Sequence, residues 1–142
     1  MRKGRATILV EDFCKAIMAN DLNGFMTRFQ AFLAGIDYEL KLPYEKYYQT
    51  IFFVVFRLMG TFIEAESRTN EGRIDAYVRT PKTVYIFEFK LNQTAQTAID
   101  QIVDRRYVEK FMGGGLPIVC VGANFNSKKG RLDSWKQLTV NG

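Results

Sequence analysis

The clearest structural pattern in this sequence is GRIDAYVRTPKTVYIFEFKL, residues 72–91. Apolar and polar residues alternate on both sides of residues 81–82, which is typical of two strands joined by a tight turn. The short connection predicts antiparallel pairing between a strand over 72–80 and a strand over 83–91. A further strand over 61–67 precedes them after a polar turn, so we expect a three-stranded antiparallel meander.

Helical patterns flank this meander. Apolar residues recur at helical spacing over residues 6–19 and again after Asp21, a favourable N-cap. A third helix is predicted over 43–59, between a proline and a glycine that suit its two ends. Downstream of the meander, Thr94 caps a helix that the apolar pattern extends to about Met112.

Two more strands are predicted towards the C-terminal end, an apolar and central one over 116–122 and an edge strand over 131–140. The order is therefore helix, three strands, helix, strand, with two extra helices in front. This order predicts an α/β (α+β) fold, a mixed β-sheet with helices packed on it. We expect residues 1–40 to form a helical N-terminal extension or linker packed on the core, and residues 41–142 to form the main domain.

The charge distribution points to a polyanionic partner. The 142 residues carry 20 Lys and Arg against 15 Asp and Glu, a net charge of +5. Charges balance in residues 1–40, so the whole excess lies in 41–142. A basic domain suits phosphate neutralisation, although a basic surface that merely confers solubility explains the charge equally well.

The absence of histidine excludes several kinds of chemistry. With no His in the sequence, Ser-His-Asp and Cys-His catalysis and histidine-ligated zinc are ruled out. Any enzymatic reaction must therefore rest on carboxylates, lysine and a hard cation. Cys14 and Cys120 form no CxxC pair and are expected to be buried and reduced. No signal peptide or membrane-spanning segment is recognisable, so we expect a cytoplasmic protein with no membrane partner.

The residues best suited to chemistry are Asp75, Glu88 and Lys90. Because side chains alternate along a strand, Glu88 and Lys90 share one face, and the meander can bring Asp75 beside them. Two adjacent carboxylates repel, and a shared divalent cation relieves the repulsion, while a nearby lysine can orient or deprotonate a water molecule. A solvated face explains Glu-x-Lys as well, and the same pattern recurs at residues 39–41.

Six short stretches, in a characteristic order, extend this pattern beyond the triplet: Glu45-Lys46-Tyr47-Tyr48, Leu58-Met59-Gly60, Gly72-Arg73-Ile74-Asp75, Tyr85-Ile86-Phe87-Glu88-Phe89-Lys90, Asp100-Gln101-Ile102 and Val121-Gly122-Ala123-Asn124-Phe125. With them, the sequence from Tyr44 to Trp135 resembles the PD-(D/E)XK nuclease superfamily. Within it, the sequence is most similar to the branch that forms the C-terminal domain of predicted bacterial AAA-type ATPases. The resemblance implies a restriction-endonuclease-like mixed sheet in α-β-β-β-α-β order.

The resemblance also implies roles for individual residues. Asp75 and Glu88 would ligate Mg²⁺ or Mn²⁺, together with a main-chain carbonyl near Phe89, and Lys90 would assist the attacking water. Ile74 stands where the namesake motif has proline, but this position holds no ligand.

Two further residues would join this site. Glu45 would match a helix carboxylate that some members add, although an acidic residue also favours a first helical turn in its own right. Gln101 would lie beside the site, and its alternative is an exposed polar position on a helix.

Candidate phosphate contacts are the arginines on or near the elements that carry the site, namely Arg68, Arg73, Arg105 and Arg106. The predicted function is a divalent-metal-dependent nuclease that hydrolyses DNA rather than RNA. The alternative is a catalytically inactive relative that binds nucleic acid or protein. The chain contains no GxxxxGK[ST] motif, so an ATPase would be an upstream domain of the same polypeptide. A homodimer is left open.

Overall fold

The computed structural model describes residues 5–35, 45–70 and 73–141. In four short stretches, 5–8, 45–49, 68–70 and 73–75, the description is confined to the backbone. Residues 36–44, which include the predicted start of the third helix at residue 43, lie outside the described residues. The helices and strands are α1 Arg5–Met18, α2 Leu22–Ala34, α3 Glu45–Met59, β1 Glu64–Asn70, β2 Arg73–Arg79, β3 Val84–Leu91, α4 Ala95–Asp104, the 3₁₀ helix η2 Tyr107–Phe111, β4 Ile118–Asn126 and β5 Arg131–Val140.

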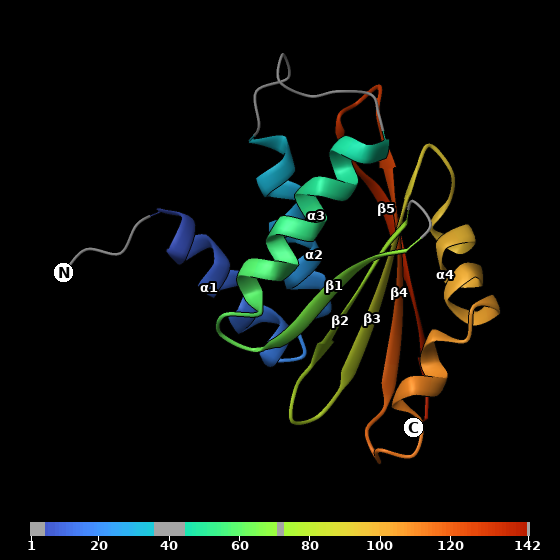
Figure 1. Ribbon diagram of the computed structural model, residues 1–142. Coiled ribbons are helices and arrows are strands. Elements are labelled where there is room, and N and C mark those ends of the chain that lie inside the picture. Colours follow the sequence, from blue (N-terminus) through green and yellow to red (C-terminus); the bar gives the residue numbers. More distant parts are fainter. Residues whose placement is uncertain (1–4, 36–44, 71–72, 142) are drawn as a thin grey trace.

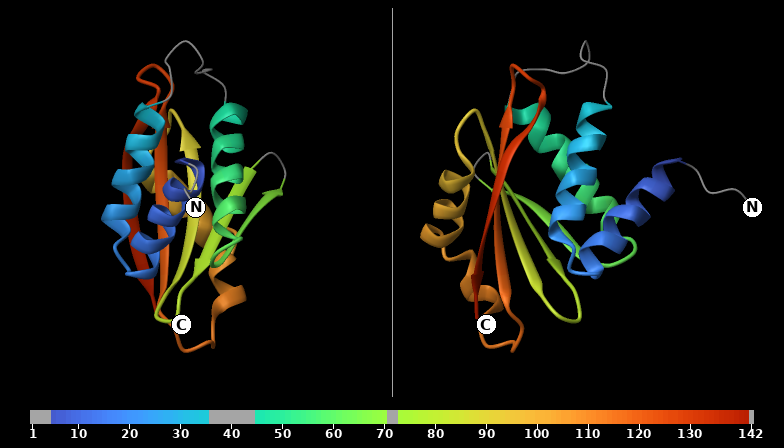
Figure 2. Two further views of the ribbon diagram at one scale, coloured as in Figure 1. Left: turned by 90° about the vertical axis from the view of Figure 1, so that its left-hand side faces the viewer. Right: turned by 180° about the vertical axis from the view of Figure 1, so that it is seen from behind.

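The five strands form one mixed sheet in the order β1-β2-β3-β4-β5. Pairing is antiparallel from β1 to β3, parallel between β3 and β4, and antiparallel between β4 and β5. The meander and the α/β class are thus confirmed. Helix α4 makes the crossover that two parallel neighbours require. Helices α1, α2 and α3 cover one face of the sheet and α4 covers the other (Figures 1 and 2).

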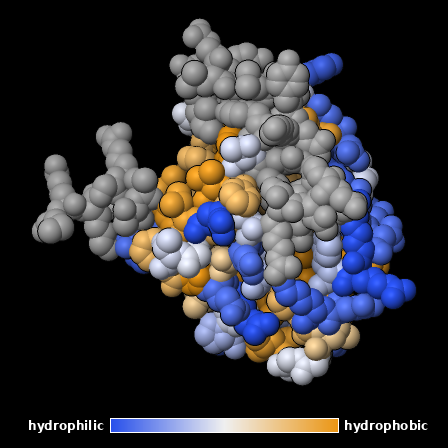
Figure 3. Space-filling view, viewed as in Figure 1, coloured by the Kyte–Doolittle hydropathy of each residue, from blue (hydrophilic) through white to orange (hydrophobic). Residues whose placement is uncertain are grey.

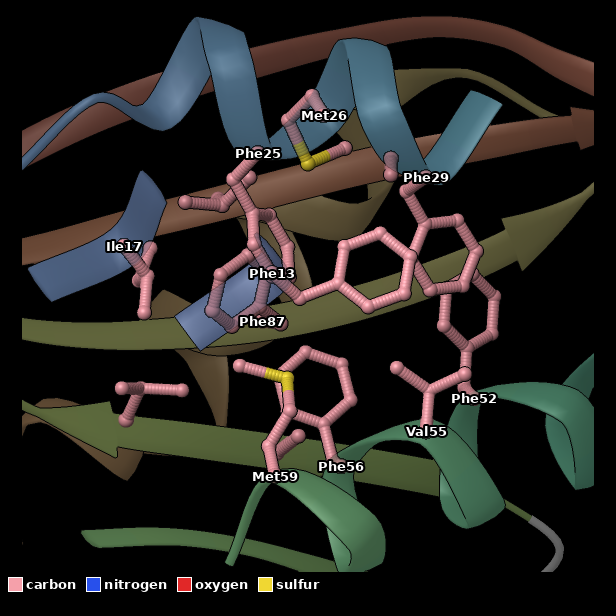
Figure 4. Close-up of a cluster of buried hydrophobic side chains, with 14 of the residues drawn as sticks. Phe13, Ile17, Phe25, Met26, Phe29, Phe52, Val55, Phe56, Met59 and Phe87 are labelled. Atoms are coloured by element: carbon pink, nitrogen blue, oxygen red, sulfur yellow. The ribbon is translucent and has the colours of Figure 1, made fainter. Parts of the chain in front are cut away.

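A cluster of phenylalanine rings joins the first three helices to the sheet (Figure 4). The rings of Phe29 on α2 and Phe52 on α3 stack with centroids 4.6 Å apart. Phe87 on β3 lies 5.5 Å from the ring of Phe25 and 5.1 Å from that of Phe56. Helices α1 and α2 therefore contribute to the same buried cluster as the central strand β3.

Two predicted boundaries are wrong at the ends of helices. Strand β1 begins at Glu64 rather than Thr61, because the last turns of α3 continue through hydrogen bonds from the backbone N–H groups of Thr61 and Ile63 to carbonyls of that helix. Helix α4 ends at Asp104 and not near Met112, because Arg106 adopts a left-handed conformation with φ 59°. This break directs the side chain of Phe111 into the smaller hydrophobic cluster beneath α4.

The outer side of the helical layer is partly apolar. Val54 and Leu58 on α3 are 46% and 44% exposed and line a groove of about 270 Å³ between α1, α2 and α3. Figure 3 shows hydrophobic residues at the surface in this region. Among the described residues, none of the helices combines the length and apolarity needed to cross a bilayer.

Replacing Phe52 with alanine should lower the free energy of unfolding by about 3–5 kcal/mol, because a buried ring is lost and a cavity remains. The exposed Phe62, whose side chain is 51% accessible, is the matched control and should change stability by about 0.5 kcal/mol or less. Urea denaturation followed by circular dichroism measures both. Equal effects of the two substitutions would contradict the assigned core.

Candidate functional site

Strand β3 divides its side chains between the two faces of the sheet. Phe87 and Phe89 enter the aromatic cluster under α1–α3, whereas Ile86 joins the smaller cluster under α4. By alternation, Glu88 and Lys90 lie on the α4 face with Ile86. The common face predicted for the pair is thus what the structure shows.

Both members of the pair are deeply buried. Glu88 is 1% exposed and Lys90 is 6% exposed, and Lys90 Nζ lies 3.9 Å from Glu88 Oε1. That separation is an ion pair but is too long for a hydrogen bond. A carboxylate has about four lone-pair sites, and an ion pair of this length does not by itself occupy them. Removing two charges from water is costly, and the attraction between them repays this cost only where the geometry is favourable.

The backbone of Asp75 is the direct partner of Glu88 in the ladder between β2 and β3. Directly opposed residues of an antiparallel pair share one face of the sheet. Residue 75 therefore belongs to the same face and the same level of the sheet as Glu88. The side chain of Asp75 lies outside the described part of the structure.

On the other side of Glu88, Gly122 of β4 allows helix α4 to approach the sheet closely. A Cβ atom at this position would collide with the carbonyl oxygen of Ala95 and would lie 2.8 Å from the backbone nitrogen of Ile99. Gly122 is also the parallel-strand neighbour of Glu88. The first turns of α4 thus pack directly beside the buried carboxylate.

Asn124 is a buried polar residue for which the sequence analysis predicted no role. It is 4% exposed and is the neighbour of Lys90 in the register between β3 and β4. Its Oδ1 accepts a hydrogen bond of 2.8 Å from the backbone N–H of Gln93. Asn124 therefore fixes the connection from β3 to α4. In the sequence, the feature that could have indicated Asn124 is an amide side chain within the otherwise apolar run of β4.

Gln101 lies on α4 and is half-buried. Its Oε1 is buried and has no hydrogen-bond donor among the described residues. A buried carbonyl oxygen without a donor is costly and is usually explained by a water molecule, an ion or a ligand. Gln101 is thus not the fully exposed helix residue of the alternative interpretation.

The four predicted phosphate contacts separate into two pairs. The backbones of Arg68 and Arg73 belong to the end of the sheet where β3 finishes, and Arg68 is the ladder partner of Asp75. Arg105 and Arg106 lie at the far end of α4, about 15 Å along the helix from its first residue. Arg106 is exposed and pairs with Glu109 at 3.8 Å. Arg105 and Arg106 therefore lie away from the first turn of α4, and their role as phosphate contacts stays a prediction.

The structure describes the predicted metal site only in part. Within the described side chains, no three acidic or cysteine groups are arranged to hold a metal ion. The side chains of Glu45, at the first residue of α3, and of Asp75 are outside that set. Burial raises the pKa of the Cys120 thiol to about 11, so this thiol is neutral and a poor ligand. Asp75 and Glu45 stay the predicted partners of Glu88.

A five-stranded mixed sheet flanked by helices, with a glutamate and a lysine two residues apart on its central strand, is consistent with a restriction-endonuclease-like fold. The family profile that matches residues 43–135 is described as the PD-(D/E)XK nuclease superfamily. The chain therefore belongs to this superfamily, whose members are generally nucleases and usually use divalent metals.

A curated relative is an uncharacterized protein in the vnfD 5′ region of Azotobacter chroococcum mcd 1. It is 37% identical over an alignment of 117 positions, which covers 78% of this chain and 23% of that protein. The chain thus spans less than a quarter of the length of this relative. No solved structure matches the chain.

Substituting Gly122 with alanine should destabilise the domain by about 1–3 kcal/mol, because the added methyl group meets backbone atoms of α4 that cannot move independently. The control is Gly114→Ala, since a Cβ there has its nearest neighbour at 3.5 Å. Thermal or urea unfolding measures both variants. A Gly122→Ala protein as stable as the parent would refute the close packing of α4 on β4.

Proposed function

We propose that this domain is a metal-dependent nuclease whose centre is formed by Asp75, Glu88 and Lys90. The observation that carries the proposal is the buried pair of Glu88 and Lys90 on the central strand, with Asp75 opposite Glu88 in the ladder. Burying a carboxylate and an ammonium group is costly, and a role in binding or catalysis explains why such a pair is present. The superfamily match over residues 43–135 supports a nuclease role for this pair.

The chemistry of the donor set fits a hard divalent cation. Glu88 and Asp75 would bind Mg²⁺ or Mn²⁺ through carboxylate oxygens, which these ions prefer. A main-chain carbonyl near Phe89 would be the third protein ligand. Bound there, the ion would supply charge neutralisation at the phosphate and acidity to a coordinated water. Buried Glu88 is well suited because a negative charge in a low-dielectric site attracts a cation strongly.

The remaining residues would position the reactants. Lys90, held 3.9 Å from Glu88, would orient the attacking water or stabilise charge on the phosphate. Gln101 would use its buried Oε1 to accept a hydrogen bond from a water molecule in the site. Glu45 would add a carboxylate from the first turn of α3. Water would attack phosphorus and the bond to the 3′ oxygen would break, leaving a 3′-hydroxyl and a 5′-phosphate.

We further propose that DNA rather than RNA is the substrate. The domain would act in the cytoplasm, as part of a longer protein with an upstream ATPase domain. The net charge of +5 supports a polyanionic substrate. The relative from Azotobacter, of which this chain spans 23%, supports a larger architecture. A homodimer is compatible with this arrangement.

The alternative function is an inactive relative that binds nucleic acid. It would keep the basic charge of the chain, a net +5, without the metal chemistry. Such a protein would bind DNA in a salt-dependent manner but would bind no Mn²⁺ at the position of Glu88.

The substitutions Glu88→Gln and Lys90→Met should each reduce Mn²⁺-dependent cleavage of DNA at least roughly a hundredfold, because each removes one charge from the centre while keeping its volume. A gel assay with supercoiled and linear DNA measures the rates, and circular dichroism verifies folding.

The matched control for these variants is Glu64→Gln. Glu64 is an exposed carboxylate at the opposite end of the sheet, 3.1 Å from Arg79, and its loss should leave the cleavage rate unchanged. Full cleavage by a folded Glu88→Gln protein would exclude the proposed centre.

A further inference from the structure

The turn between β4 and β5 carries a cluster of cations that the sequence analysis did not single out. Residues 127–134 contain Lys128, Lys129 and Arg131 and a single acidic residue, Asp133. All three cationic residues are exposed. Lys129 pairs with Asp133 at 3.8 Å, so Lys128 and Arg131 account for the excess positive charge of the turn.

This turn is attached to the segment that follows Lys90. Asn92 donates through Nδ2 to Ser127 Oγ at 2.8 Å and accepts at Oδ1 from the Ser127 backbone N–H at 2.9 Å. The backbone N–H of Asn92 also donates to the carbonyl of Phe125 at 2.7 Å. The β4–β5 turn and the β3–α4 connection therefore form one end of the sheet, as Figure 1 shows.

The turn is also ordered by its own hydrogen bonds. Oδ1 of Asn126 accepts from the backbone N–H groups of Lys128 and Lys129, at 3.0 and 3.1 Å. The backbone of Gly130 donates to the carbonyl of Asn126 at 2.8 Å and has a φ of 63°, which glycine tolerates without strain. A preordered turn presents its cations without the entropic cost of ordering a loop on binding.

The turn is close enough to the centre for one DNA strand to reach both. Asn124 is the neighbour of Lys90, and Lys128 follows four residues later, so the two levels differ by no more than about 13 Å at 3.3 Å per residue. Each DNA strand carries a phosphate about every 3.4 Å of helix axis. A strand whose scissile phosphate lies at Lys90 thus has further phosphates within reach of the turn.

We propose that the β4–β5 turn, through Lys128 and Arg131, binds the phosphate backbone of duplex DNA beside the scissile position. This proposal rests on the proposed nuclease function. It adds the cations of this turn to the predicted phosphate contacts Arg105 and Arg106 in the C-terminal half of the chain. The contacts would be independent of base sequence, since lysine and arginine meet only phosphate there.

The test is the salt dependence of DNA affinity, measured by fluorescence anisotropy with a short labelled duplex in EDTA, so that no cleavage occurs. For the double variant Lys128→Ala/Arg131→Ala, the slope of log K against log salt should be smaller by about 2, and Kd at low salt should be roughly tenfold weaker. The control is Lys82→Ala, an exposed lysine in the β2–β3 turn at the opposite end of the sheet, which should change neither quantity.

A second variant distinguishes a lost phosphate contact from a loss of folding. Asp133→Asn removes the carboxylate beside Lys129 and should tighten binding, which an unfolded protein would not do. An unchanged slope in the double variant, or an equal effect of Lys82→Ala, overturns the proposal. Since Glu88-dependent cleavage is measured separately, failure of this contact would be distinguishable from failure of the nuclease function itself.

Discussion

The burial of one carboxylate and one ammonium group on the central strand of the sheet is the constraint that organises this domain. Glu88 and Lys90 expose 1% and 6% of their surfaces, in positions where an apolar alternation would be more stable. Their separation of 3.9 Å gives electrostatic attraction without a direct hydrogen bond. The strand therefore carries a charged pair that destabilises the fold, which is consistent with the proposed cation site.

The rest of the fold holds this pair in place from both sides. The opposite face of β3 is fixed by Phe87 and Phe89, which belong to the ring cluster built by α1, α2 and α3. On the side of the pair, Gly122 lets α4 approach closely, and Asn124 fastens the connection that follows β3. A rigid strand between two packed layers keeps charged groups within the narrow tolerances that catalysis requires.

Much of this arrangement could be predicted from the sequence. The alternation of residues 83–91 placed Glu88 and Lys90 on one face, and the short turn at 81–82 implied the pairing that sets Asp75 against Glu88. The end of α4 could not be predicted, because the apolar spacing continues to Phe111 while the left-handed Arg106 depends on packing beneath the helix. The structural role of Asn124 could not be predicted either, because it depends on a neighbouring residue on another strand and not on a motif.

The most direct test of the central claim is a crystal structure of the domain soaked with Mn²⁺, with the anomalous signal used to locate the ion. We expect an ion bound by carboxylate oxygens of Asp75 and Glu88, at distances of about 2.0–2.3 Å, with Lys90 beside it. Asp75 and Glu88 side chains that point to separate surfaces, with no anomalous peak between them at millimolar Mn²⁺, would contradict it.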